Sequence, residues 1–183
     1  LSDLGADAIK TGMLGDADVI DAVARVLADR AAGVPLVVDP VMVAKGGASL
    51  LARSAHEALV ARLLPRATVI TPNLPEAEAL LGRPVADVAA MREAARDLQA
   101  MGPAAVLVKG GHLEGDRVID VLRLASGEEL VFESARIHTR STHGTGCTLA
   151  SAIAAGLAQG LALRDAVERA RAYVVEADRK SVV

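Results

Sequence analysis

The chain has 183 residues, of which 52% are hydrophobic and 23% charged, and its formal net charge is -3. A chain of this length and composition can bury a sizeable core, which excludes disorder of the whole chain. The slightly negative charge and the aromatic content of 1% argue against a broad basic surface or aromatic platform for nucleic acid. The single cysteine, Cys147, excludes an internal disulfide and fits a reducing compartment, so we expect a cytoplasmic protein.

No apolar stretch reaches the roughly 18 residues needed to cross a bilayer, and residues 1–10 lack the basic start and apolar core of a signal peptide.

The two ends of the sequence look incomplete. The chain does not begin with Met, residues 1–4 read like the end of a helix, and residues 178–183 form no closing element. We therefore expect that both ends are cut.

Short apolar runs alternate with longer amphipathic stretches along the chain. In chain order, the predicted elements are a strand at 8–10, a helix at 17–31, a strand at 34–38, a helix at 54–64, a strand at 67–71, a helix at 75–81, a helix from 87 to 101, a strand at 104–108, a strand pair at 117–124 and 128–133, and helices at 148–159 and 163–179. Ser54 and Glu57 have the spacing of a capping box, and Asp87 is the expected N-cap of its helix.

This alternation predicts an α/β fold, with a mostly parallel sheet and helices on both faces. No linker or repeat divides the chain, so one domain over 1–183 is the simplest organisation. In such sheets a ligand lies beyond the carboxyl ends of the strands. Asp39, Asn73, Lys109 and the loop at Gly144 all follow predicted strands or open helices, so we expect them at one edge of the sheet.

A glycine-containing loop, Ser141 to Thr148, opens the helix rich in small residues near the C-terminus. Backbone N–H groups at a helix N-terminus carry partial positive charge, and Gly144 and Gly146 would let several of them face one anion. The alternative is a glycine turn before a packed helix, and the loop is not a P-loop. Cys147 stands where the helix favours a thiolate, although most single cysteines are small buried hydrophobes.

Asn73 and Glu76 follow another strand and open a helix. Their spacing is that of a capping box, but Glu76 could instead hold Mg²⁺ or its water near phosphates, oriented by Asn73. Spacing alone does not separate these interpretations, and both can hold.

Lys109 and Asp39 each end or follow a buried strand. Lys109 could contact phosphate oxygens, or could simply extend from the strand end into solvent. Asp39 could lie near metal and phosphate, or could form a turn. Met13, in Thr11-Gly12-Met13, could line a pocket or simply pack.

The ordered set of these segments is more specific than any one of them. It comprises Lys-Thr-Gly-Met-Leu at 10–14, Val-Val-Asp-Pro-Val-Met at 37–42, Thr-Pro-Asn-Leu-Pro-Glu at 71–76, Val-Lys-Gly-Gly-His at 108–112 and His-Gly-Thr-Gly-Cys-Thr at 143–148. Over nearly the whole chain this set resembles the hydroxymethylpyrimidine/phosphomethylpyrimidine kinases of thiamine biosynthesis, within the ribokinase-like superfamily. The resemblance implies the three-layer ribokinase-like fold.

The resemblance also implies roles for individual residues around the transferred phosphoryl group. Cys147 would occupy the catalytic-base position at the substrate hydroxyl, and the N–H groups of Gly144, Thr145, Gly146 and Cys147 would form the anion hole. Lys109 would contact the phosphates of ATP.

The remaining roles concern the metal and the substrate. Glu76, with Asn73, would organise Mg²⁺, and Asp39 would lie near the same phosphates. Met13 and Val41 would line the pyrimidine pocket.

The implied activity is ATP-dependent phosphorylation of hydroxymethylpyrimidine and then of its monophosphate. The expected partners are these small molecules, with neither nucleic acid nor membrane, and a homodimer is compatible with the sequence. The family's N-terminal substrate-binding segment and its C-terminal tail have no counterpart here, and a relative could be fused to another thiamine enzyme. The alternatives are a pyridoxal kinase of the same fold and a non-catalytic nucleotide-binding fragment; a sugar kinase would carry Asp where this chain has Cys147.

Overall fold

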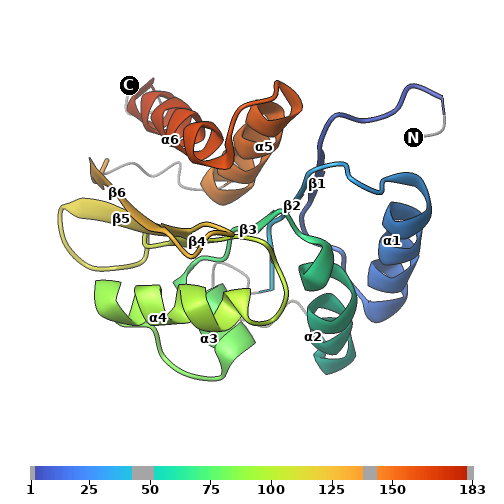
Figure 1. Cartoon of the computed structure of the whole chain (residues 1–183). Helices are drawn as coiled ribbons and strands as arrows, with labels where there is room; N and C mark the ends of the chain where they lie inside the picture. Colours follow the sequence, from blue (N-terminus) through green and yellow to red (C-terminus); the bar gives the residue numbers. More distant parts are fainter. Residues whose placement is uncertain (1–2, 43–51, 138–143, 181–183) are drawn as a thin grey trace.

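The computed structural model describes residues 3–42, 52–137 and 144–180. Its centre is a sheet of six strands in the order β1-β2-β3-β4-β5-β6 (Figure 1). The strands are β1 (Ile9–Thr11), β2 (Leu36–Val38), β3 (Val69–Ile70), β4 (Val106–Lys109), β5 (Arg117–Arg123) and β6 (Glu129–Ala135). The pairs from β1 to β4 are parallel, and β5 and β6 add an antiparallel hairpin.

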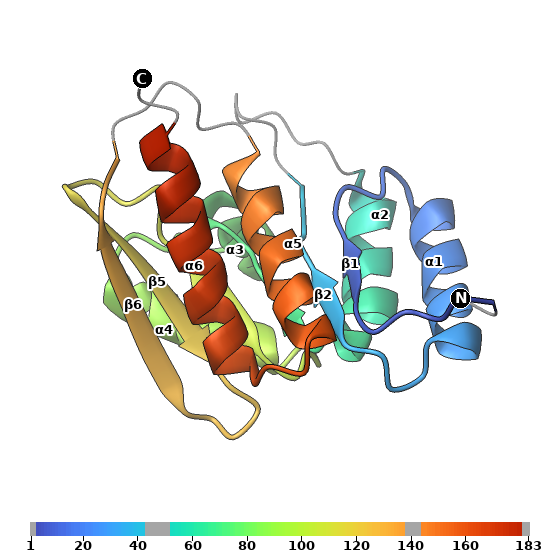
Figure 2. The same ribbon diagram turned by 90° about the horizontal axis from the view of Figure 1, so that it is seen from above.

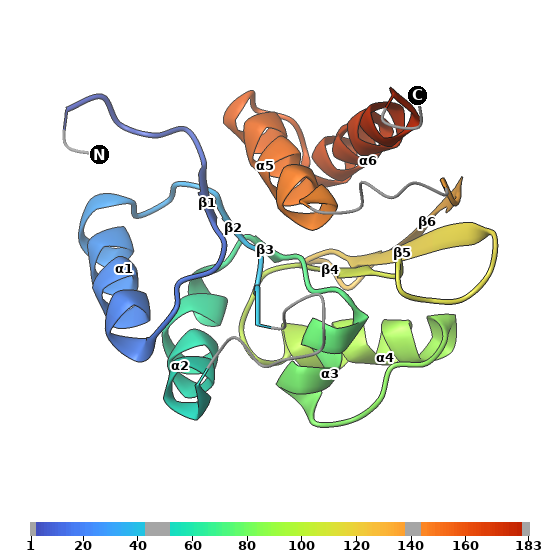
Figure 3. The same ribbon diagram turned by 180° about the vertical axis from the view of Figure 1, so that it is seen from behind.

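Helices cover both faces of this sheet, which confirms the predicted α/β architecture (Figures 1 and 3). The helical segments are α1 (Ala17–Arg30), α2 (Arg53–Ala58), a π-helical turn at Leu59–Leu63, a 3-10 turn at Leu64–Arg66, α3 (Leu74–Leu81), α4 (Val88–Gln99), α5 (Thr145–Ala158) and α6 (Leu163–Lys180). Helices α1 to α4 lie on one face, and α5 and α6 lie side by side on the other (Figures 1 and 2). None of the described helices is long and apolar enough to cross a membrane.

Two apolar cores form because the side chains of each strand alternate between the faces. Val38 and Ile70 belong to the core beneath α1 to α4, whereas Val37, Val69 and Leu107 belong to the core beneath α5 and α6. The central strands are buried on both faces, as expected for a parallel sheet covered by helices on both sides.

Local sequence signals fix several helix ends. Asp87 accepts a hydrogen bond from the N–H of Ala90 and is the N-cap of α4, as predicted. Gly82 ends α3 in the left-handed conformation, with φ of 68°. A left-handed residue after the last helical turn is most often glycine, because a Cβ disfavours that conformation.

Other boundaries differ from the predictions. Helix α2 begins at Arg53, after Ala52, without a side-chain cap. Ser54 therefore lies inside the helix, and the predicted capping box is wrong: Glu57 instead pairs with Arg53 on the exposed surface, 3.0 Å away. Residues 3–8 precede β1 without forming a helix.

Helices α4 and α5 also differ from the predictions, which ended α4 at 101 and began α5 at 148. Helix α4 ends at Gln99, and α5 begins at Thr145, three residues earlier than predicted.

Candidate active site

The carboxyl ends of the four parallel strands meet at one edge of the sheet, and this edge gathers the predicted polar residues. Lys109 ends β4, and Asn73 follows β3 and forms a bridge with Lys109. The Lys109 N–H donates to the carbonyl of Pro72 at 2.8 Å, and the Asp39 N–H donates to that of Thr11 at 3.0 Å. Asp39, Asn73 and Lys109 therefore lie together, as the sequence predicted.

The side chain of Lys109 makes a buried ion pair at this edge. Its Nζ lies 2.9 Å from Oδ1 of Asp39, and the two side chains are 12% and 2% exposed. Thr71 donates its hydroxyl hydrogen to the same oxygen at 3.1 Å. The side chain of Lys109 is thus buried at this edge rather than extended into solvent. Its ammonium neutralises the buried carboxylate of Asp39, which would otherwise be an unpaired charge.

Asn73 and Glu76 form the reciprocal capping box of α3. The N–H of Glu76 donates to Oδ1 of Asn73 at 2.9 Å, and the N–H of Asn73 donates to Oε2 of Glu76 at 2.8 Å. Burial raises the pKa of Glu76 from 4.5 to about 7, although Lys109 and the Asn73 N–H act in the opposite direction. The structural interpretation of this pair is confirmed, and its role toward a metal stays a prediction.

The donor set could take part in magnesium binding only with other ligands. No group of three or more His, Cys, Asp or Glu side chains able to hold a metal occurs in the described part of the chain. The hydrogen bonds and ion pair above engage one carboxylate oxygen each of Asp39 and Glu76. Mg²⁺ usually binds through one or two carboxylates, substrate phosphates and water. Two carboxylates, each with an oxygen that takes no hydrogen bond from the described residues, fit a shared ion.

The N-terminus of α5 lies beside Lys109. Gly144 is its N-cap in the left-handed conformation, with φ of 86°. The first intrahelical bond runs from the N–H of Thr148 to the carbonyl of Gly144 at 2.9 Å. The N–H groups of Gly146 and Cys147 precede that bond and so have no acceptor inside the helix.

Gly146 and Cys147 bring this helix terminus to the lysine. A Cβ on Gly146 would lie 3.1 Å from Nζ of Lys109, so the glycine permits a close approach. Cys147 is exposed in the first turn, which contradicts the alternative of a buried small hydrophobe. The residues of the motif before Gly144, Ser141 to His143, lie outside the described residues.

Two predicted substrate residues follow β1 and β2. Met13 is 62% exposed, and Val41 is half-buried, with its N–H donating to the carbonyl of Asp39 at 2.8 Å. Both residues follow the carboxyl ends of parallel strands, as Lys109 does. Their role as the wall of a pyrimidine pocket stays a prediction.

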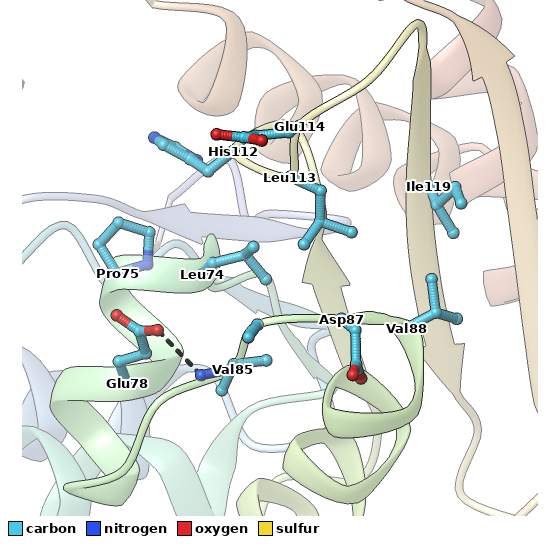
Figure 4. Close-up of a pocket in the computed structure, with 11 residues that line it drawn as sticks. Leu74, Pro75, Glu78, Val85, Asp87, Val88, His112, Leu113, Glu114 and Ile119 are labelled. Atoms are coloured by element: carbon cyan, nitrogen blue, oxygen red, sulfur yellow. Dashed lines mark hydrogen bonds between the residues drawn. The ribbon is translucent and has the colours of Figure 1, made fainter.

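A pocket of about 630 Å³ lies next to this edge, on the face covered by α3 and α4 (Figure 4). His112 and Leu113, from the loop between β4 and β5, form one wall, and Leu74 and Val85 lie across from them. None of the predicted site residues lines it, so this pocket is separate from the cluster around Lys109. Partial burial lowers the pKa of His112, and the cations of Lys109 and Arg136 lower it further.

Sequence reasoning missed three polar residues near Lys109. Thr71 supports Asp39, as described above. Asp120 accepts the N–H of Gly110 at 2.9 Å, and Arg136 donates to the carbonyls of the loop after Gly110. Asp120 left one signal in the sequence: it is a carboxylate between apolar residues in the middle of a predicted strand.

A mostly parallel α/β sheet carries a lysine, two carboxylates and a glycine-led helix terminus at its carboxyl edge, which agrees with the ribokinase-like fold implied by the ordered motifs. Solved kinases of that fold superpose on nearly the whole chain. The chain belongs to the phosphomethylpyrimidine kinase family, whose model matches residues 1–182. This family assignment confirms the resemblance inferred from the ordered motifs.

Individual relatives support the same assignment. The chain is 50% identical, over 97% of its length, to a hydroxymethylpyrimidine/phosphomethylpyrimidine kinase of Streptomyces coelicolor, and it spans 64% of that kinase. A crystal structure of phosphomethylpyrimidine kinase from Clostridium difficile superposes with a TM-score of 0.83 at 36% identity, covering 96% of this chain and 71% of that one. A pyridoxal kinase from Staphylococcus aureus in complex with ADP reaches a TM-score of 0.86 at 37% identity, over 94% and 62% of the two chains.

Proposed function

We propose that this chain transfers a phosphoryl group from ATP to 4-amino-5-hydroxymethyl-2-methylpyrimidine, and then to the resulting monophosphate, in thiamine biosynthesis. The observation that carries the proposal is the exposed Cys147 in the first turn of α5, next to Gly146, where that turn approaches the ammonium of Lys109. The curated relatives that carry this activity in their names match nearly the whole chain.

Phosphoryl transfer needs alignment and positive groups where charge gathers, and little covalent help. Lys109 would leave Asp39 for the phosphates of ATP, and the N–H groups of Gly146 and Cys147 would receive the equatorial oxygens of the transferred group. Cys147 would orient the acceptor hydroxyl and accept its proton. Glu76 and Asp39 would hold Mg²⁺, which would neutralise phosphate charge when bound.

A second candidate function is pyridoxal phosphorylation. It is favoured by the likeness to the S. aureus pyridoxal kinase, whose TM-score is at least as high as that of the C. difficile kinase. The higher identity to the curated pyrimidine kinases places it second. A nucleotide-binding role without catalysis is the third candidate.

The test is ATP-to-ADP turnover with Mg²⁺, using the product of the complete gene. The acceptors are hydroxymethylpyrimidine, its monophosphate, pyridoxal and ribose. Turnover with the first two is expected. Turnover with pyridoxal alone would replace the substrate but keep the mechanism, and ATP binding without turnover would leave the non-catalytic role.

The same proposal covers the setting of the enzyme. We place it in the cytoplasm, where its exposed thiol stays reduced, and we treat 1–183 as one ribokinase-like domain that can form a homodimer. Size-exclusion chromatography with light scattering tests the assembly.

A further inference from the structure

Asp120 lies on β5, directly opposite Lys109 on the neighbouring strand β4. In the antiparallel pairing of β4 with β5, Asp120 is the register partner of Lys109. Its side chain is 7% exposed. One carboxylate oxygen accepts the N–H of Gly110 at 2.9 Å, and the other accepts Nε of Arg171 at 2.7 Å. One oxygen therefore holds the backbone just after β4, and the other binds α6.

The hydrogen bond to Gly110 ends the ladder between β4 and β5. Lys109 is the last residue of β4 with a partner in β5, and at the next residue a side-chain carboxylate receives the N–H. A Cβ on Gly110 would lie 2.0 Å from the carbonyl oxygen of Ile119, so only glycine allows this approach. On the opposite side the Lys109 N–H is held by Pro72. The backbone at Lys109 and Gly110 is thus fixed from both neighbouring strands.

Arg171 connects this point to the helix layer that carries the anion site. It projects from α6, which packs against α5 (Figure 2). Its guanidinium carbon lies 5.4 Å from the centre of the Phe132 ring, a cation–π contact that adds to the attachment of α6 to β6. Because α5 brings Gly146 to Nζ of Lys109, one ion pair ties both sides of the phosphate site together.

We propose that Asp120, held by Arg171, is a positioning residue for nucleotide binding: it sets the backbone at Lys109 and Gly110 so that the ammonium and the N-terminus of α5 face the same phosphate. This inference rests on the proposed function. A charge-assisted hydrogen bond to a backbone N–H is stronger than a neutral one and has a defined direction, so its loss frees the strand end that carries Lys109.

Three variants separate positioning from stability. Asp120→Ala removes the acceptor for Gly110 and leaves Arg171 without its carboxylate partner. Asp120→Asn keeps an acceptor for Gly110 but loses the ion pair. Asp120→Leu with Arg171→Met replaces both partners by apolar groups, a change that is often neutral for stability, yet it leaves the Gly110 N–H without its acceptor.

A matched control lies at the other end of the same hairpin. Glu129 pairs with Arg123 at 2.9 Å and with Arg92 at 3.2 Å. Glu129→Ala should therefore lower the melting temperature, as Asp120→Ala does, without touching the end of β4 that carries Lys109.

The measurements are the Kd for ATP·Mg²⁺ by calorimetry, the KM for ATP, kcat and the melting temperature, in the product of the complete gene. We expect Asp120→Ala and the Leu/Met double variant to raise the Kd and KM for ATP about tenfold, with kcat and the KM for the acceptor changed by less than about threefold. Asp120→Asn keeps a neutral acceptor for Gly110 but loses the ion pair, so its Kd and KM for ATP should lie between those of wild type and Asp120→Ala. Glu129→Ala should also keep the wild-type Kd.

The outcomes are distinct. ATP affinity that follows the melting temperature across the four variants would overturn the inference, because it would show a structural role alone. If Asp120→Ala does not fold, the double variant decides: wild-type affinity in it would overturn the inference, and a tenfold loss would support it. A wild-type protein that binds no ATP would overturn the proposed function together with this inference.

Discussion

Cys147 is the residue on which the proposed chemistry turns. It is exposed in the first turn of α5, ahead of the first intrahelical hydrogen bond. We predict that Cys147→Ala lowers turnover by about 10²-fold or more, the usual contribution of a general base, and leaves the Kd for ATP unchanged. Ser151→Ala, an exposed change on the same helix, is the matched control. Unchanged turnover would remove Cys147 from the mechanism.

Glu76 makes stability depend on pH, because burial raises its pKa from 4.5 to about 7. The unfolded chain ionises this carboxyl at lower pH than the folded chain does. The stabilisation is therefore complete below pH 4.5 and is lost as pH rises through about 7, by up to about 3 kcal/mol.

The prediction for Glu76 is that Glu76→Gln removes this loss. Urea denaturation at pH 5 and pH 8 should show a smaller fall in the free energy of unfolding for Glu76→Gln than for wild type. Glu93→Gln, on an exposed position of α4, should keep the wild-type difference. Equal differences in wild type and Glu76→Gln would contradict the role of the buried carboxyl.

Among single residues, the sequence predicted those site residues that belong to a recognisable local pattern. Lys109 after a buried strand and the Asn73–Glu76 spacing were found because their signals lie within a few neighbours. Asp120 and Arg171 are 51 positions apart, and a pairing of that separation appears only once the sheet has brought α6 over β5. The dual role of Glu76, cap and buried acid, likewise depends on burial, which spacing does not contain.

The loop between β4 and β5 is held by one side chain from the end of β6. Arg136 donates to the carbonyls of Gly111 and Gly115 at 2.8 and 2.7 Å, and also to that of Leu113. The Leu113 N–H bonds to the Gly110 carbonyl at 3.0 Å, within the same loop. This loop follows Lys109 directly and carries His112 of the pocket wall, so a change in its conformation would affect both.

We predict that Arg136→Ala speeds hydrogen exchange of the Leu113 amide about tenfold or more, because several hydrogen bonds to a charged donor are lost together. Arg136→Lys should restore little, since one ammonium does not reproduce the planar fork. Hydrogen exchange read by mass spectrometry measures both. Arg117→Ala, which removes a surface ion pair in the same hairpin, is the control, and equal exchange in all variants would contradict the clamp.

The start of a helix was predicted correctly where one residue was the clear N-cap, and incorrectly where the expected cap lies inside the helix. Asp87 caps α4 as expected, because an aspartate before an amphipathic stretch has few competing uses. The Ser54–Glu57 pattern failed because α2 begins one residue earlier, at Arg53, so Ser54 lies inside the helix and cannot cap it. After Ala58 the helix loosens into a π turn and then a 3-10 turn ahead of β3. Pro65, which cannot continue an α-helix, marks the 3-10 turn in the sequence, but no signal predicted the π turn.

One sheet separates two apolar cores, and its central strands contribute side chains to both. Leu63 is fully buried in the core on the side of α1 to α4, and Ile153, a residue of α5, is fully buried in the core on the side of α5 and α6. Because β2, β3 and β4 belong to both cores, neither core can lose its packing without disturbing the other.

We therefore predict that Leu63→Ala and Ile153→Ala each lower the free energy of unfolding by about 2–5 kcal/mol, within a single cooperative transition. Urea denaturation followed by far-UV circular dichroism measures this, with an unchanged m-value expected. Leu4→Ala, at a side chain that is 95% exposed, should have little effect. Two separate transitions would show that the layers unfold independently and would contradict one domain over 1–183.

The architecture as a whole was the most predictable level. Apolar runs of strand length alternate with helical periodicity, and the crossover rules leave few arrangements for such a chain. The order β1 to β6 also follows the chain directly, so the motifs after successive strands lie side by side without a rearranged topology. What the sequence could not supply was the distance between them, such as the 2.9 Å from Lys109 to Asp39.

Cys147 is the only cysteine in the chain and is exposed. An alkylating reagent such as iodoacetamide should therefore add one mass increment per molecule, at the mouth of the anion site. The rate of that alkylation, read by mass spectrometry, therefore reports how much of the anion site is occupied, because a ligand bound at the N-terminus of α5 would shield the sulfur. The same thiol offers a place to attach a spin label or fluorophore without engineering away competing cysteines, in a chain that has no tryptophan of its own.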